Sequence, residues 1–151
     1  MLIDWVKPSK YRLHASEQQR SYVKRRRVSW KRQQRRLDVV KLVFLDETGA
    51  KTNMTRLYGW APSQQRVKDL VPHGHWETTT LIHAIDCHGS RASMITNGPI
   101  NSWVFEAYVD WLLAPALRPG DIVIMDNLSS HKNPMALEKI RTTGAEVRFL
   151  P

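Results

Sequence analysis

The chain has 151 residues, of which 42% are hydrophobic and 25% charged, and its formal net charge at pH 7 is +9. This length suits one domain with a real core and is too short for two full domains. The apolar stretches are far shorter than a membrane span, no signal peptide is recognisable, and the single cysteine, Cys87, excludes an internal disulfide. We therefore expect a cytoplasmic protein without a membrane segment.

The positive charge is concentrated in the first quarter of the chain. Residues 1–40 contain 12 Lys and Arg against 3 Asp and Glu, which accounts for the whole net charge. Residues 20–38 have good helix formers, no Gly or Pro and few apolar side chains, which predicts a helix that lies on a surface. Such a helix is typical of phosphate binding, although a solvated linker has the same pattern. The side chains expected to contact DNA, the arm cations, are Lys24, Arg25, Arg26, Arg27, Lys31, Arg32, Arg35 and Arg36.

From residue 39 onward the pattern becomes that of a globular domain. Runs rich in β-branched and aromatic residues predict strands, and the second and third of them are expected to pair antiparallel. Strands that alternate with helices later in the chain favour parallel pairing, so we expect a mixed α/β sheet. The predicted elements are strands at 39–47, 78–89 and 90–96, a helix at 100–117, a strand at 119–126, a helix at 133–144 and a strand at 145–151.

Two of the apolar runs are followed by a carboxylate, Asp46 in the first and Asp126 in the fourth. If the two strands are neighbours, these residues lie about 5 Å apart and repel each other unless a proton or a cation separates them. Carboxylate oxygens on a rigid sheet suit Mg²⁺ or Mn²⁺, and two such ions can promote phosphodiester cleavage. The alternative is that each aspartate only ends its strand or caps the following turn.

Two other chemistries are less consistent with the sequence. A nucleotide hydrolase needs a glycine-rich phosphate loop with Lys and Ser or Thr, and this sequence contains none. A zinc site needs paired ligands at characteristic spacings, which are also missing. The side chains considered for zinc are His73, His75, His83, Cys87 and His88.

Three motifs together carry a family resemblance: "LVFLDETG" at 42–49, "YGWAP" at 58–62 and "DIVIMDNLSSHK" at 121–132. In this order and at these separations they resemble the catalytic domain of mariner-like transposases of bacterial insertion sequences. These enzymes belong to the DDE superfamily. The resemblance extends from about residue 14 to residue 151. It implies a ribonuclease H-like mixed sheet with flanking helices, preceded by a basic helical arm.

The resemblance also implies roles for individual residues. Asp46 and Asp126 match the first two catalytic aspartates, which bind the Mg²⁺ or Mn²⁺ ions that activate water and later the free 3′ end. Asn127 and His131 match family positions beside the second aspartate, where they are expected to position the DNA or the coordination shell of the metal. Glu47 is expected to support the site rather than bind metal. Trp60 in "YGWAP" matches a hairpin of the family, where packing alone would also explain it.

The third acid of the family has no counterpart in this sequence. In the family it follows the strand matching residues 147–151, on a helix. Glu138 and Glu146 lie too early to replace it. We therefore expect a truncated catalytic domain that lacks the final helix, comprising a basic arm at 1–38 and a partial ribonuclease H-like domain at 39–151. The two-metal site would be incomplete and strand transfer impaired.

These observations lead to a main functional hypothesis and two alternatives. The main one is a truncated DDE transposase catalytic domain that acts on DNA at transposon ends, with a homodimer or the full-length transposase as further partners. The second is a non-catalytic DNA-binding remnant that interferes with full-length transposase. The third, a ribonuclease H-like nuclease for structured nucleic acid, would need a further acid that the sequence does not offer.

Overall fold

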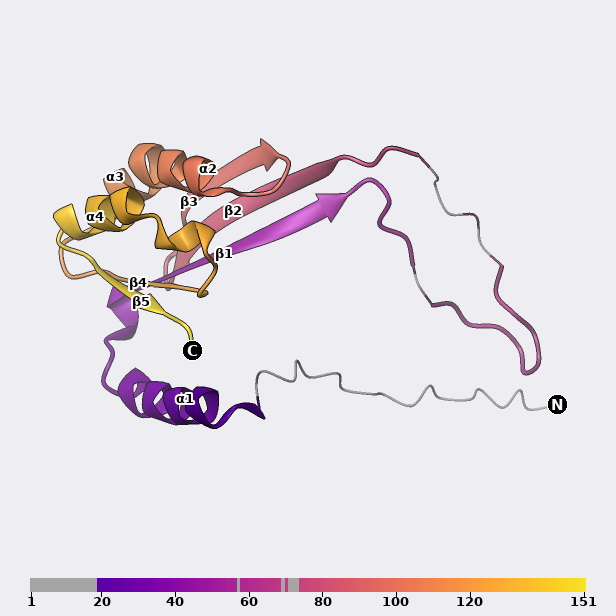
Figure 1. Ribbon diagram of the computed structural model, residues 1–151, viewed down its shortest axis with the longest axis horizontal. Helices are drawn as coiled ribbons and strands as arrows, with labels where there is room; N and C mark the ends of the chain where they lie inside the picture. Colours follow the sequence, from indigo (N-terminus) through magenta and orange to yellow (C-terminus); the bar gives the residue numbers. More distant parts are fainter. Residues whose placement is uncertain (1–18, 57, 69, 71–73) are drawn as a thin grey trace.

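The computed structural model describes residues 19–56, 58–68, 70 and 74–151. Within these residues the chain forms a five-stranded sheet with the order β3-β2-β1-β4-β5 (Figure 1). The first three strands pair antiparallel, whereas β4 lies parallel to β1 and β5 parallel to β4. The predicted mixed sheet is therefore confirmed. The strands are β1 (Leu42–Lys51), β2 (Thr78–Asp86), β3 (Gly89–Asn97), β4 (Ile122–Met125) and β5 (Glu146–Phe149).

The helices that follow β3 cover one face of the sheet (Figure 1). The helix predicted at 100–117 is present, and the side chain of Asn101 caps its first backbone N–H groups. A π-turn interrupts it just before Pro115, which has no N–H to donate to the preceding turn. No helix in the described ranges is long and apolar enough to cross a membrane. The helical segments here are α2 (Ser102–Tyr108), the π-turn η3 (Val109–Leu113), α3 (Ala114–Ala116), the 3₁₀ turn η4 (Ser130–Lys132) and α4 (Pro134–Thr142).

The core lies between the sheet and these helices. Successive side chains of a strand point to opposite faces, so Val43 and Leu45 face the helices and are buried. Phe44, between them, points to the other face and is 45% exposed. The same alternation places Asp46 on the face away from the helices and Glu47 on the helix-covered face. The core side chains contributed by the helices include Phe105, Tyr108, Val109, Leu113, Ala136 and Ile140.

Strand β1 begins and ends later than predicted. Residues Val39–Lys41 form a short 3₁₀ turn, and the strand then continues to Lys51. The prediction that Asp46 ends its strand is wrong, because antiparallel pairing with β2 continues to the end of β1. Pairing with β4, in contrast, stops at Phe44 and Ile124. Asp46 therefore lies just beyond the point at which β1 loses its parallel neighbour.

A long connection joins β1 to β2 and extends away from the sheet (Figure 1). Its described residues, within 52–77, form no helix or strand. A Cβ atom added at Gly59 would lie 2.9 Å from Val67 Cγ1, so the two limbs touch and position 59 favours glycine. Trp60 is 69% exposed, which shows that it does not belong to the core.

Helix α1 (Ser21–Gln34) is the helix predicted within the basic arm, and it lies on the side of β5 away from α4 (Figure 1). None of its residues is buried. Trp30 and Arg36 line a hollow together with Arg148 and Phe149 of β5, so the arm approaches the sheet at this edge. The part of the arm at 1–18 lies outside the described residues.

A charged cluster ties the β2–β3 hairpin to the start of β4. Arg91 donates from Nη2 to Asp121 Oδ2 at 2.7 Å, and its Nε lies 3.0 Å from Asp86 Oδ2 without hydrogen-bond alignment. The backbone N–H of Arg118 donates to the same Asp121 oxygen at 2.8 Å. Desolvation raises the pKa of Asp86, but the hydrogen bond from the His88 N–H and the charge of Arg91 together outweigh it, and the net pKa is lowered.

Candidate active site

Asp46 lies on β1, and Asp126 follows directly after β4, the parallel neighbour of β1. The last paired residues of β1 and β4 are Phe44 and Ile124. Extending that register by two residues places Asp126 opposite Asp46, and adjacent strands run about 5 Å apart. The two strands are therefore neighbours, which is the condition under which the two carboxylates come close together. The two carboxylates therefore lie on adjacent segments of chain, just beyond the point where the parallel pairing ends.

The backbone orients one oxygen of each aspartate. Asp46 Oδ1 accepts from the N–H of Glu47 at 2.9 Å, and Asp126 Oδ1 accepts from the N–H of Leu128 at 3.2 Å. Among the described residues, neither carboxylate forms an ion pair with a Lys or Arg side chain. The Asp126 side chain is 42% exposed. The second oxygen of each aspartate is therefore available to a cation from solution.

A fully buried histidine connects the site to the helix-covered face. His131 Nε2 lies 2.9 Å from Glu47 Oε1, and Nδ1 lies 2.7 Å from Asp126 Oδ1, although the second contact lacks hydrogen-bond alignment. The ring of Phe105 packs against the imidazole at a centroid distance of 4.6 Å. The structure thus brings two of the expected supporting residues, Glu47 and His131, together with Asp126. The third, Asn127, is exposed beside Asp126.

Sequence reasoning missed one neighbour of Asp46. His83 was considered only as a zinc ligand, but the β1–β2 register places it directly opposite Asp46. Its Nδ1 lies 3.1 Å from Ser93 Oγ on β3. The turn at Gly89 predicts the β2–β3 pairing, which sets His83 opposite Ser93. No local signal gives the β1–β2 register, because a long connection separates these two strands.

The two aspartates fit a divalent metal ion of the Mg²⁺ or Mn²⁺ type. Such ions take one or two carboxylates and complete their coordination with water and substrate phosphate oxygens. Within the described ranges, no three side chains of His, Cys, Asp or Glu converge in a way that could hold a metal. His73, one of the side chains considered for zinc, lies outside the described residues. Asp46 and Asp126 would therefore leave several positions of the ion to water and DNA.

Comparison with known proteins identifies a family and several solved structures of similar fold. The family described as "DDE superfamily endonuclease" matches residues 41–151. The mariner Mos1 paired end complex with Mg has a TM-score of 0.69 and 20% identity, over 97% of this chain and 47% of that one. The Mos1 transposase paired-end complex with the left transposon end gives 0.67 and 18%, over 96% and 46%. The catalytic domain of Mos1 mariner transposase gives 0.57 and 16%, over 93% and 63%.

No curated protein matches the chain. The chain spans less than half the length of the two Mos1 complexes, and at these identities the likeness concerns the fold. That fold is the ribonuclease H-like one expected from the motifs. The family match is independent of the structural likeness and covers nearly all of the globular part. The chain therefore belongs to the DDE superfamily endonuclease family.

Proposed function

We propose that the chain carries the divalent-metal site of a DNA transposase, with Asp46 and Asp126 as metal ligands. The observation that supports this most is the parallel pairing of β1 with β4, which ends two residues before Asp46 and Asp126, in a family of endonucleases. Asp46 and Asp126 would hold the ion, and bound Mg²⁺ or Mn²⁺ would supply Lewis-acid activation of a phosphoryl oxygen and of water. The corresponding reaction is cleavage and joining of DNA strands at transposon ends.

The protein's own groups would position the reacting parts. Asp46 lies within the part of β1 that pairs with β2, from Phe44 to Lys51, so its backbone position is fixed by the sheet. Asp126 follows directly after β4, and its Oδ1 is held from the protein side. Asn127 is exposed beside it and is proposed to contact DNA or water of the metal shell. Glu47 and His131 are proposed to support the site rather than to react.

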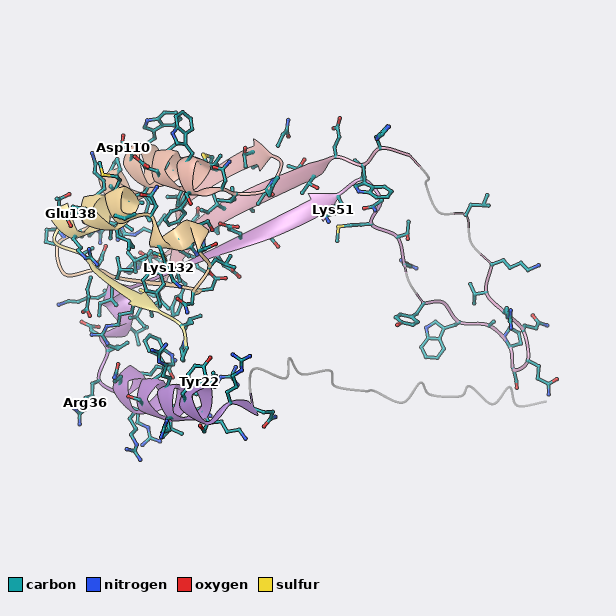
Figure 2. All side chains as sticks on the ribbon, viewed as in Figure 1. Tyr22, Arg36, Lys51, Asp110, Lys132 and Glu138 are labelled. Carbon is teal, nitrogen blue, oxygen red and sulfur yellow. The ribbon has the colours of Figure 1, made fainter. Side chains whose placement is uncertain are left out.

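DNA is the proposed partner of the basic arm. Within the described ranges none of the eight arm cations forms an ion pair with a carboxylate. Figure 2 shows side chains of α1 projecting outward from the helix. Lys24 and Arg32 lie on one face of the helix with Val28 between them, at a spacing of four residues. Unpaired cations arranged along one helix are suited to the phosphates of a DNA backbone.

A metal-removal experiment tests the proposed function. The full chain is expected to nick supercoiled plasmid slowly in the presence of Mn²⁺ or Mg²⁺, and not at all in EDTA. The reaction is expected to be slow because no third ligand joins the two aspartates among the described residues. Gel electrophoresis of the plasmid over time measures it. Nicking that continues in EDTA would contradict the proposal.

A second candidate is a non-catalytic DNA-binding protein that interferes with full-length transposase. The exposed basic helix favours it, since that helix needs no metal to bind phosphate. It predicts tight DNA binding without any metal-dependent nicking. We further propose that the chain forms a homodimer or a complex with the full-length transposase. Such a complex would be the means by which the chain interferes with that enzyme.

Neutralising α1 is expected to weaken DNA binding and its salt dependence. The variant Arg25→Gln/Arg32→Gln keeps good helix formers, and each lost phosphate contact reduces the slope of log affinity against log salt by about 0.9. Fluorescence anisotropy with a DNA duplex at several salt concentrations measures this slope. Lys139→Gln/Arg141→Gln on α4 removes the same charge elsewhere and is the matched control. Equal effects of the two variants would exclude a specific role for α1.

A further inference from the structure

His131 is the most completely enclosed polar side chain near the two aspartates. Its exposed fraction is 0%, and the ring of Phe105 packs against it at an interplanar angle of 39°. A buried ring held in this way cannot turn freely, so the directions of its two nitrogens are set by the fold. One nitrogen faces Glu47 and the other faces Asp126.

Glu47 is held at the other end of this contact. It follows Asp46 in sequence but points to the opposite, helix-covered face of β1, where its side chain is only 18% exposed. Its Oε1 lies 2.9 Å from His131 Nε2. A carboxylate only accepts hydrogen bonds, so the Nε2–H of His131 is the donor in this pair. Glu47 therefore faces the imidazole, on the face of β1 opposite to Asp46.

The contacts of Asp126 are unequal between its two oxygens. Oδ1 accepts from the Leu128 N–H at 3.2 Å and lies 2.7 Å from His131 Nδ1, a contact without hydrogen-bond alignment. Among the described residues, Oδ2 has no hydrogen-bond or ion-pair partner. The carboxylate is thus held by one oxygen while the other remains open on a side chain that is 42% exposed.

We propose that Glu47 and His131 form a positioning clamp for Asp126, which turns Oδ1 toward the protein and presents Oδ2 as the metal-binding oxygen. This inference rests on the proposed function, since it assumes that Asp126 is a metal ligand. Outer-shell groups packed behind a metal ligand fix its orientation, and their loss typically weakens metal affinity by about 10- to 100-fold. Glu47 and His131 are positioning residues in this arrangement and do not contact the ion.

The test is Mn²⁺ binding to the full chain without DNA, measured by isothermal titration calorimetry. Glu47→Ala is expected to weaken Mn²⁺ binding by about 10- to 100-fold. Glu47→Gln keeps the length and an acceptor oxygen for His131, so its affinity is expected to lie between those of Glu47→Ala and the wild type. ¹H–¹⁵N NMR provides a second readout. An imidazole N–H proton of His131 that exchanges slowly with water is expected in the wild type and in Glu47→Gln, and its signal is expected to be absent in Glu47→Ala.

Controls separate this role from a general effect on folding. Lys139→Gln removes one member of the exposed pair that Lys139 forms with Asp110, at 2.6 Å, and is expected to bind Mn²⁺ like the wild type. Melting temperatures in EDTA show whether each Glu47 variant is folded without metal. A folded Glu47→Ala variant with wild-type Mn²⁺ affinity would overturn the clamp.

The same titration distinguishes failure of the clamp from failure of the proposed function. Wild-type binding that is lost in Asp46→Asn but unchanged in Glu47→Ala would leave the metal site in place and remove only the clamp. If Asp46→Asn and Asp126→Asn both bind Mn²⁺ with wild-type affinity, the ion is bound elsewhere and both proposals are overturned. Binding that is lost in the aspartate variants and weakened in Glu47→Ala supports both.

Discussion

Replacing Asp126 by asparagine is expected to lower metal-dependent DNA nicking by at least about 100-fold, while the affinity for DNA stays at its wild-type level or rises slightly. Asparagine keeps the shape of the side chain and an oxygen that can accept from the Leu128 N–H. It removes the negative charge that a divalent ion requires. Loss of a residue that only supports a metal ligand can lower metal affinity or activity by up to about 100-fold. Loss of the ligand itself should therefore lower the nicking rate at least as much.

The affinity for DNA is expected to persist because it depends on other residues. Phosphate binding is proposed to come from the arm cations, which lie on α1 and the turn after it. The nicking rate on plasmid and the anisotropy of a labelled duplex measure the two properties separately. Asp110→Asn is the matched control, since Asp110 lies on the helix layer, away from α1 (Figure 2). Wild-type nicking by Asp126→Asn would contradict the assignment of Asp126.

Replacing Arg91 by methionine is expected to lower the free energy of unfolding by about 3 kcal/mol, the typical cost of removing one partner from a buried ion pair. Methionine retains much of the volume of arginine but leaves Asp121 without its guanidinium partner, and the Asp121 side chain is only 7% exposed. This carboxylate would keep the N–H of Arg118 as a donor and lose its only ion-pair partner among the described residues. Urea denaturation at pH 7, followed by tryptophan fluorescence, measures the change.

Two comparison variants test the physical reason for this loss. The double variant Arg91→Met/Asp121→Asn removes both charges and is expected to recover part of the lost stability, because no unpaired charge then remains in that contact. Arg141→Met removes an exposed arginine that lies 3.7 Å from Glu138, and it should change stability by less than about 1 kcal/mol. If Arg91→Met were no more destabilising than Arg141→Met, the buried cluster would not stabilise the fold as argued.

Local sequence patterns were sufficient to predict most of the elements. The apolar run before Asp126 predicts a buried strand, and β4 is buried along nearly its whole length. Pro134 and Gly144 bracket the last predicted helix, and α4 begins at Pro134 and ends two residues before Gly144. These signals are local because they depend on side-chain periodicity and on the backbone limits of Pro and Gly.

Features that depend on distant pairing were predicted less well. The end of β1 was placed too early because the length of that strand is determined by its pairing with β2, which continues well past the last residue paired with β4. The contact between Glu47 and His131 joins residues 84 positions apart, and no local pattern indicates it. Its members were expected near the site only through a family resemblance. The geometry that links them to Asp126 required the folded chain.

The central claim is that Asp46 and Asp126 together hold a divalent metal ion. The most direct measurement is anomalous X-ray diffraction from crystals of the full chain grown with Mn²⁺, recorded near the manganese absorption edge. The account predicts an anomalous peak coordinated by a carboxylate oxygen of Asp46 and by Oδ2 of Asp126. A manganese peak at other residues, or one that contacts only one of the two aspartates, would contradict it.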